Sequence, residues 1–529
     1  MKEKRQSFMG GAAVLAGAVA VTKLIGALYK IPLGNLLDKE GMAHFYVAYN
    51  IYNLMMILST AGLPLALSRL VSQAHALGQE NQKRRIFRVA LGMFVALGVV
   101  CGGAMLLFPG QLAQLLQDSQ AKLAIMALAP SVLCVCLLSA IRGYTQGQGN
   151  MVPTAASQII ESSCKLLIGL TLAWLLLRAG FGSETAAAGA IAGVTVGSAL
   201  SLLALSVYLL RRREAKKGQD VPQGRREIAK ELLRIGVPVT IGAGTMSCIT
   251  LLDQILVMGT LQNRLGLTEA AATALYGEYT FGMTLFNLPS SFIYPVTVSL
   301  IPTIGAALAR RDNHGAQQST EAAFRVTALL ALPAGTGLAV LAGPILDLLY
   351  PAVPETAAAA AYHLSVLGIA CVFVCLAIMT GGVLQAYGKE HVPVLSLLCG
   401  GVLKIVANRA LVADPAIGIK GAAVGTLCCY VLITLINLIA IHRAVPQRPD
   451  YFAVLCKPVI ITAIMAVVAR GSWSLLDRLL HGSGMATLIA IALAAVVYGI
   501  AALVLGAVKR QDLLALPKGE KIADFLHLS

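Results

Sequence analysis

Long apolar stretches alternate with short polar connections along the whole chain. Each apolar stretch has about 20 residues, the length of helix that crosses a ~30 Å hydrocarbon core. The fourteen stretches cover residues 9–29, 45–68, 89–109, 122–141, 153–177, 186–210, 232–257, 279–305, 325–350, 359–383, 392–411, 419–442, 453–472 and 485–508. This pattern predicts an all-α integral membrane protein with about 14 transmembrane helices.

The longest polar connection, residues 211–228, follows the sixth stretch and divides the chain. Six apolar stretches lie on each side of it, and two more complete the chain. We therefore expect four parts, which are an N-terminal six-helix lobe at 9–210, a basic cytoplasmic linker at 211–228, a C-terminal six-helix lobe at 229–442 and an additional C-terminal helix pair at 453–508.

The two halves share short motifs in the same order. Three residues of the first half recur 239 positions later, as Gln146 and Gln385, Gly149 and Gly388, and Lys165 and Lys404. "GAIAG" at 189–193 likewise resembles "GAAVG" at 421–425. Because both halves begin on the same side of the membrane, the pattern indicates parallel repeats related by an axis along the membrane normal. The glycines Gly189, Gly193 and Gly197 form a GxxxGxxxG face suited to close helix packing.

Composition and charge add an orientation. The chain has 529 residues, of which 57% are hydrophobic and 12% charged, with a mean hydropathy of +0.77 and a net charge of +16. If the N-terminus is cytoplasmic, most of the 41 Lys and Arg fall in cytoplasmic segments, as the positive-inside rule requires. The run "RRREAKKGQDVPQGRR" at 211–226 then acts as an orientation signal attracted to anionic membrane lipids, and we expect no nucleic-acid partner. Both termini should be cytoplasmic.

Catalytic, metal and cofactor motifs do not stand out in the sequence. The eleven cysteines lie in or beside apolar stretches, with no CxxC pair and no Cys/His cluster at ligand spacing. No stretch resembles a hydrolase elbow or a P-loop, and the short loops leave no room for a soluble catalytic domain. We therefore expect a transporter rather than an enzyme, without a metal or a cofactor.

Charged residues inside apolar stretches are the candidates for function, because a charge at the bilayer centre costs at least ~2.5–3.5 kcal/mol. Lys165 lies roughly 18 Å along its helix from Pro153, and Lys404 roughly 16 Å from Pro393, so both should be near mid-membrane. An ion pair with Glu161, four residues earlier, is an alternative explanation for Lys165. For Lys404 the alternative explanations are snorkelling of its side chain and a partner on another helix.

Two further basic residues and one acid complete this charge set. Snorkelling competes with a functional role for Lys23, and Arg69 is suited to anchoring at the membrane interface. Asp253 in the seventh stretch could bind a coupling cation or pair with a lysine. Gln146 and Gln385 fall at predicted helix-to-helix turns, where turn chemistry alone explains the neighbouring glycines. The excess of basic over acidic residues suits an anionic substrate.

Several motifs resemble one family across essentially the whole chain. They are "TKLIGALYKIPLGNLL" at 22–37, "AGLPLALSRLVSQ" at 61–73, "RGYTQGQGNMVPTAASQIIE" at 142–161 and "LQAYGKEHVP" at 384–393. These segments are similar to the polysaccharide-biosynthesis flippases of the multidrug/oligosaccharidyl-lipid/polysaccharide exporter superfamily. Within it they most resemble the branch of stage V sporulation protein B and the MurJ-like lipid II flippases.

The resemblance implies a function in the bacterial cytoplasmic membrane. Such a protein moves a polyprenyl-diphosphate-linked sugar outward by alternating access through a central cationic cavity. Lys23 matches a functional basic position of the family, whereas Tyr29, Met55 and Met56 stand where Gram-negative lipid II flippases carry arginines. Peptidoglycan, teichoic, capsular and spore-related precursors therefore all stay open as cargo. The candidate substrate-binding residues are Lys23, Arg69, Arg142, Gln146, Glu161, Lys165, Gln385 and Lys404, with Asp253 as the coupling residue.

Two other functions compete with this interpretation. A cation-coupled multidrug exporter of the same superfamily should carry an acid in the first stretch, where this chain has Lys23. A membrane-embedded polysaccharide polymerase or glycosyltransferase should carry a large polar loop with acids and histidines, whereas the longest loops here are basic.

Overall fold

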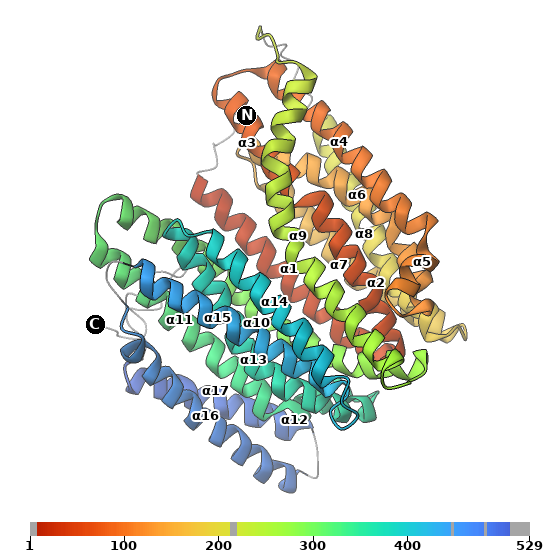
Figure 1. Cartoon of the computed structure of the whole chain (residues 1–529), viewed down its shortest axis with the longest axis vertical. Helices are drawn as coiled ribbons and strands as arrows, with labels where there is room; N and C mark the ends of the chain where they lie inside the picture. The colour runs from red at the N-terminus through yellow and green to blue at the C-terminus, as the bar shows by residue number, and fades with distance from the viewer. Residues whose placement is uncertain (1–7, 212–218, 446–448, 481–483, 508–529) are drawn as a thin grey trace. The chain divides into compact units, whose positions relative to one another are not determined.

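The computed structural model describes residues 8–211, 219–445, 449–480 and 484–507, and within these ranges every regular element is helical (Figure 1). The first helices are α1 (Phe8–Leu36), α2 (Lys39–Thr60), α3 (Gly62–Ala76), α4 (Glu80–Leu107), α5 (Pro109–Leu115), the short η1 (Ser119–Ala121), α6 (Lys122–Gly147), α7 (Val152–Arg178) and α8 (Ser183–Arg211). The later helices are α9 (Arg225–Asn263), α10 (Glu269–Ala309), α11 (Asn313–Val340), α12 (Ala342–Leu349), α13 (Pro354–Ala386), α14 (His391–Leu411), α15 (Lys420–Ala444), α16 (Tyr451–Leu479) and α17 (Gly484–Val504). The centre of the predicted linker and both chain ends lie outside the described residues.

The predicted membrane stretches coincide with helices. Thirteen helical segments of the described chain are long and apolar enough to cross a membrane, against the expected fourteen or so. The stretch at 279–305 also lies in a helix, α10, which is not among these thirteen. An all-α, multi-pass membrane protein is therefore confirmed.

Two of the predicted stretches are interrupted rather than continuous. The stretch at 45–68 contains the end of α2 and the start of α3, with Ala61 between them. Pro64 falls in the first turn of α3, where its missing N–H costs no helical hydrogen bond. The stretch at 325–350 is divided in the same way between α11 and α12 at Leu341.

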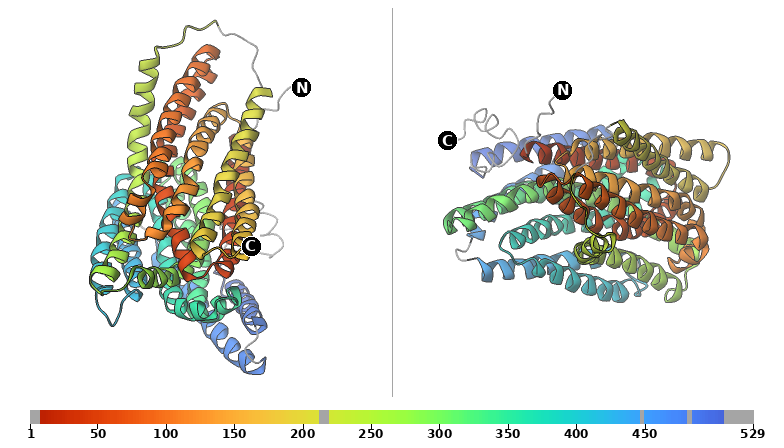
Figure 2. Two further views of the ribbon diagram at one scale, coloured as in Figure 1. Left: turned by 90° about the vertical axis from the view of Figure 1, so that its right-hand side faces the viewer. Right: turned by 90° about the horizontal axis from the view of Figure 1, so that it is seen from above.

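Residue contacts divide the chain into two compact units, Met1–Gly277 and Glu278–Ser529. In the first unit α6 packs against α4 and α8, α7 packs against α8 and α1, and α9 packs against α2 and α3 (Figures 1 and 2). The unit boundary therefore falls inside α10, whereas we expected a lobe boundary at residues 211–228. The four predicted parts remain a prediction.

The second unit repeats part of this packing order. Its α13 packs against α11 and α15, and α14 packs against α15, just as α6 packs against α4 and α8, and α7 against α8. Helices α16 and α17 pack against each other, and α16 packs on α11. This order supports the predicted internal repeat.

The turns at Gly149 and Gly388 have the same hydrogen bonding. Gly149 has φ 80° and Gly388 φ 70°, values that favour glycine. The Gly149 N–H donates to the carbonyl of Gln146, and the Gly388 N–H donates to that of Gln385. A second bond spans six residues in each turn, from Asn150 to Thr145 and from Lys389 to Leu384. Both α6 and α13 therefore end in a Schellman motif, which explains why these glycines recur.

The GxxxGxxxG face of α8 is a packing surface, as predicted. A Cβ atom at Gly189 would meet the Leu176 side chain, and one at Gly193 would meet the backbone of Gly169. At Gly197 it would meet the carbonyl of Glu161. Helices α7 and α8 can approach this closely only without those side chains.

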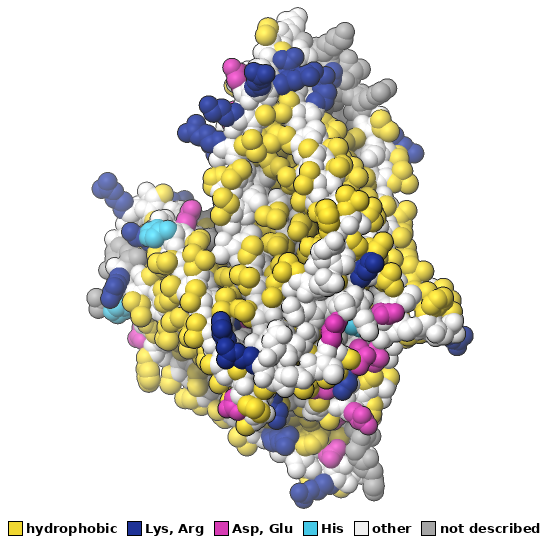
Figure 3. All heavy atoms as spheres, turned by 45° about the vertical axis from the view of Figure 1, so that its right-hand side comes forward, with side chains coloured by type: hydrophobic (Ala, Val, Ile, Leu, Met, Phe, Trp, Pro, Cys, Tyr) yellow, Lys and Arg dark blue, Asp and Glu magenta, His cyan; other side chains and the backbone are white. Residues whose placement is uncertain are grey.

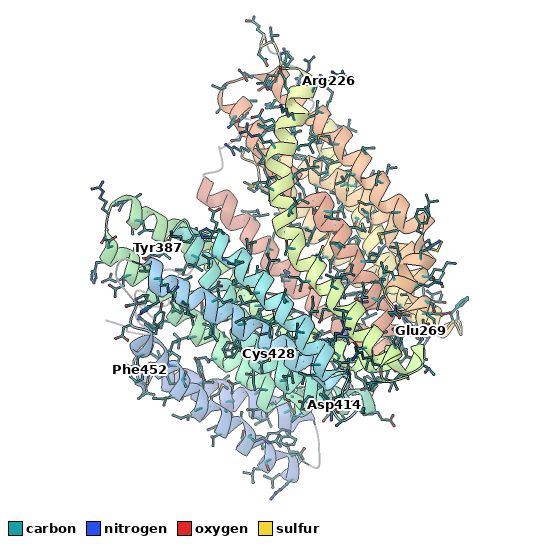
Figure 4. All side chains as sticks on the ribbon, viewed as in Figure 1. Arg226, Glu269, Tyr387, Asp414, Cys428 and Phe452 are labelled. Carbon is teal, nitrogen blue, oxygen red and sulfur yellow. The ribbon has the colours of Figure 1, made fainter. Side chains whose placement is uncertain are left out.

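The two ends of the first unit differ in charge. At one end Asp220 accepts hydrogen bonds from the N–H groups of Asn81 and Gln82, which brings the described end of the basic segment onto the start of α4. Lys and Arg side chains gather at that end in Figure 3, and Arg226 marks it in Figure 4. At the other end of α9, Figure 4 shows Glu269, which accepts a hydrogen bond from Ser119. This polarity agrees with the charge bias of the sequence.

Candidate functional site

Lys165 lies on α7 among tyrosine side chains. Its Nζ is 3.3 Å from the hydroxyl of Tyr49, and 4.4 Å from the centre of that ring. The centre of the Tyr29 ring is 4.9 Å from the same Nζ. We call Tyr29 and Tyr49 the tyrosine cage. Both distances are within the range of cation–π attraction, so aromatic faces rather than a carboxylate hold this ammonium.

A backbone carbonyl and neighbouring aromatic rings hold the two rings of the cage. Tyr29 on α1 is fully buried and donates a hydrogen bond of 2.9 Å to the carbonyl of Ala190 on α8. Tyr49 on α2 stacks on Phe45, with ring centres 5.6 Å apart and planes 10° apart. Tyr52 packs against Tyr49 from the next turn. The spacing of 45, 49 and 52 places these three rings on one face of α2.

A second lysine lies on the same row of aromatic residues. Lys30 on α1 donates a hydrogen bond of 2.8 Å to the hydroxyl of Tyr46 and lies 4.5 Å from the centre of its ring. Tyr46 in turn packs edge-on against Phe45. Helices α1 and α7 thus supply one ammonium group each, Lys30 and Lys165, and α2 supplies the row of aromatic rings that both contact.

Arg142 on α6 forms the ion pair with Glu161. Its guanidinium lies 3.0 Å from the Glu161 carboxylate and also donates to the hydroxyl of Ser157, at 2.9 Å. The side chains are only 14% and 23% exposed, so the pair is largely shielded from solvent. The alternative in which Glu161 pairs with Lys165 along its own helix is therefore wrong. Glu161 pairs instead with Arg142 on the adjacent helix α6.

The cluster has an excess of positive charge. Arg142 and Glu161 neutralise each other, while the described structure gives Lys165 and Lys30 hydroxyl and ring partners only. Two ammonium groups without a carboxylate partner leave a local field that favours an anion. Lysine binds phosphate as a point charge, which allows the anion to be released again.

The structure does not bring every predicted residue to this cluster. Lys23 on α1 and Arg69 on α3 are exposed, and no hydrogen bond or ion pair within the described chain joins either one to the cluster. Gln146 donates to the hydroxyl of Thr154 within its own turn, and Gln385 is exposed. Their binding roles remain predictions, and the observed contacts of Gln146 are those of a helix-to-helix turn.

Lys404 and Asp253 lie on two other helices, α14 and α9. Lys404 is half-buried on α14 in the second unit. Asp253 is buried on α9, and the next residue, Gln254, accepts a 2.6 Å hydrogen bond from Asn50 of α2. Asp253 belongs to the first unit, and its helix α9 packs against α2, which carries Tyr49.

Sequence reasoning missed three residues of the cluster as site residues, namely Tyr29, Lys30 and Tyr49. The aromatic spacing of α2 was a usable signal, because residues 45, 49 and 52 recur on one helix face. Nothing comparable in the sequence links that face to Lys165. In the described residues no group of three or more His, Cys, Asp and Glu could hold a metal ion, and the eleven cysteines are free thiols.

Comparisons with known proteins identify the family of the chain. A family model described as "Polysaccharide biosynthesis protein" matches residues 8–307, and one described as MatE matches residues 238–409. Stage V sporulation protein B of Bacillus subtilis is 26% identical over 525 residues, covering 97% of this chain and 98% of that protein. Lipid II flippase MurJ of the same organism is 23% identical over 457 residues, covering 82% of each chain.

A solved structure shows the same fold. The structure titled "Lipid II flippase MurJ, inward closed conformation" matches with a TM-score of 0.71, covering 93% of this chain and 98% of that chain. The two sequences are 14% identical, so the match shows similarity of the fold alone.

Proposed function

Since the chain belongs to the polysaccharide biosynthesis protein family, we propose that it is a flippase for a polyprenyl-diphosphate-linked sugar. It moves this precursor across the cytoplasmic membrane by alternating access and leaves its covalent structure unchanged. The names of the relatives, a sporulation protein and a lipid II flippase, support a cell-envelope precursor as the cargo.

The observation that carries the proposal is the state of Lys165. A lysine paired with a carboxylate would have to break an ion pair before it could bind a phosphate. Here the ammonium rests on the tyrosine cage, with a hydroxyl at 3.3 Å. A cation–π contact is worth about 0.5–2 kcal/mol, so a diphosphate can displace it at little cost. The tyrosine cage thus positions the Lys165 ammonium so that it can bind an anion without breaking an ion pair.

The Arg142–Glu161 pair has a different role in this account. It neutralises the acid nearest to Lys165 along α7, so that Glu161 does not compete with the cargo for the lysine. The pair also joins α6 to α7 beside the Schellman turn. Arg142 and Glu161 therefore position the cationic cluster, and the diphosphate itself is bound by Lys165, with Lys30 as a second ammonium of the same cluster.

The other predicted residues enter as finer proposals. Lys404 holds the position in the second half that Lys165 holds in the first, and it binds the same cargo during the transport cycle. Asp253 balances the lysines or takes a coupling cation. The N-terminus, the basic linker and the C-terminus face the cytoplasm, where anionic lipids attract the linker.

A cation-coupled multidrug exporter is the second candidate, because the MatE model matches residues 238–409. The charge of the first-unit cluster argues against it. An organic cation would meet Lys165 and Lys30, each of which is positively charged and lacks a carboxylate partner in the described structure. Like charges in a poorly hydrated site repel strongly.

The proposal can be tested by measuring flipping of a polyprenyl-diphosphate sugar in liposomes that contain the purified chain. Lys165→Gln should slow flipping about tenfold or more, because one ammonium contributes a charge-assisted bond of about 1.5–3 kcal/mol. Lys165→Arg should retain part of the rate, and Lys122→Gln, at the start of α6, serves as a matched charge-removing control. Wild-type flipping by folded Lys165→Gln would refute the role of this lysine.

A further inference from the structure

A pocket opens between α14 and α15 in the second unit, with a volume of about 380 Å³. Basic side chains form one part of its wall, and these are Lys389, His391 and Arg443. Apolar side chains form the rest, and these are Val392, Ile436, Ile439 and Ala440. We call Lys389, His391 and Arg443 the basic rim and the four apolar residues the apolar floor of this pocket.

The pocket lies where the helices of this pair end. Helix α14 begins at His391 and α15 ends at Ala444. Figure 4 shows Tyr387 near this end of α14 and Asp414 at the opposite end. In a membrane-spanning pair, helix ends lie at the level of the lipid headgroups, so the rim faces the phosphates and the floor faces the acyl region.

The basic side chains of the rim are available to a ligand. Lys389, His391 and Arg443 are all exposed, and no hydrogen bond or ion pair engages their side chains within the described parts of the chain. Glu390 is exposed beside them but does not line the pocket. Three positions with donor groups thus surround one space, without a carboxylate in its wall.

A hydrogen bond spans the corresponding place in the first unit. The repeat places Asn150 at the position of Lys389, and alignment of "GAIAG" with "GAAVG" places Tyr208 at that of Ala440. Asn150 donates a hydrogen bond of 2.9 Å to the Tyr208 hydroxyl, which ties the start of α7 to α8. In the second half a lysine and an alanine replace this pair. Ala440 leaves room where Tyr208 has a ring, and Lys389 adds a charge where Asn150 has none.

We propose that the pocket is a binding site for an anionic phospholipid of the adjacent leaflet. The phosphate lies between Lys389, His391 and Arg443, and the first part of an acyl chain lies along Ile436 and Ile439. A free phosphate would use only the rim, whereas a phospholipid matches both the charge and the apolar floor. Basic pockets between transmembrane helices are suited to such headgroups.

The test is native mass spectrometry of the full-length protein in detergent, titrated with phosphatidylglycerol or phosphatidylcholine of the same acyl chains. Phosphatidylglycerol should be retained preferentially. The double variant Lys389→Gln, Arg443→Gln should lose about fivefold in retention for each charge. Ala440→Tyr keeps every charge and adds a ring to the pocket wall, at the position that Tyr208 has in the first unit, and it should also lose retention. Arg310→Gln, which removes an exposed charge at the α10–α11 connection, should bind like the wild type.

Three outcomes would overturn the proposal. Unchanged retention of phosphatidylglycerol in both pocket variants would show that the lipid does not bind in this pocket. An equal loss in Arg310→Gln and in the double variant, with none in Ala440→Tyr, would indicate diffuse surface attraction instead. Displacement of the lipid by inorganic phosphate at equal concentration would show that the rim binds the free anion and that the apolar floor contributes nothing. The folded yield of each variant is measured alongside, and the double variant retains a test if Ala440→Tyr does not fold.

Discussion

Glu161 on α7 forms its ion pair with Arg142 on α6, at 3.0 Å, and not with Lys165, which lies one turn further along its own helix. This relationship separates the charges of the cluster into a neutral pair and two ammonium groups, of which Lys165 lies over the tyrosine cage. Substitutions of the pair should therefore act mainly on folding, and substitutions of Lys165 mainly on cargo.

The pair itself gives a first prediction. Arg142→Gln leaves a shielded carboxylate without its partner, which should lower the free energy of unfolding by about 1–3 kcal/mol. Glu161→Gln should lower it by a comparable amount, and the double variant by clearly less than the sum. A double-mutant cycle on thermal unfolding in detergent measures this coupling. Strict additivity would mean that the two side chains do not interact in the membrane protein.

The tyrosine cage gives a second prediction. Tyr49→Phe keeps the ring and loses the hydroxyl, whereas Tyr49→Leu loses both. The leucine variant should be less stable than the phenylalanine variant by about 0.5–2 kcal/mol, the range of one cation–π contact. The control is the same pair of variants in a Lys165→Gln background, where the difference should shrink because no cation remains. An equal difference in both backgrounds would assign it to packing alone.

Asp220 gives a prediction about pH. Desolvation acts to raise the pKa of this carboxyl, but hydrogen bonds from the N–H groups of Asn81 and Gln82 outweigh it and hold the pKa below its ordinary 3.8. The carboxylate therefore stabilises the start of α4 fully at pH values above 3.8, and this contribution is lost as the pH falls through the lower value of the folded state. Hydrogen exchange at Asn81 and Gln82 should accelerate over that acid range.

Asp220→Asn is the control for this pH effect. Its side chain does not titrate, so exchange at the same two amides should already be faster at neutral pH. After correction for the pH dependence of the intrinsic exchange rate, exchange at these two amides in Asp220→Asn should change little on acidification. If the wild type and the variant responded alike to acid, the protection would come from another group.

The orientation of the chain gives a fourth prediction. The basic end of the first unit should be cytoplasmic and the end that bears Glu269 external. In a background without the native cysteines, Asn263→Cys should react with an impermeant thiol reagent in intact cells, and Gln219→Cys should react only after lysis. Both positions are exposed in the structure. The reverse pattern would invert the topology.

The sequence predicted the helices well, and it predicted charge partners poorly. Apolar length sets where a membrane helix lies, because each backbone polar group must be bonded within its own segment. The Schellman turns at Gly149 and Gly388 were visible as recurring glycines, since few other residues adopt the required φ. The interruption at Ala61 was less visible, because the residues around it are apolar on both sides.

The site depended on which helices touch, and periodicity does not encode this. Spacing along α7 made Lys165 the natural partner of Glu161, but Arg142 reaches Glu161 from α6. The rings around Lys165 come from α1 and α2, more than a hundred residues earlier in the chain. Apolar helices can pack through several faces, so the meeting of these side chains follows only from the tertiary arrangement.

The central claim is that the cationic cluster serves an anionic lipid-linked sugar. The most direct test compares two cargo classes in the same liposomes, a polyprenyl-diphosphate sugar and a lipophilic organic cation, for the wild type and for Lys165→Gln. We predict flipping of the diphosphate lipid by the wild type, a loss of about tenfold or more in the variant, and no movement of the cation by either protein. Transport of the organic cation without flipping of the diphosphate lipid would contradict the account and establish the multidrug exporter in its place.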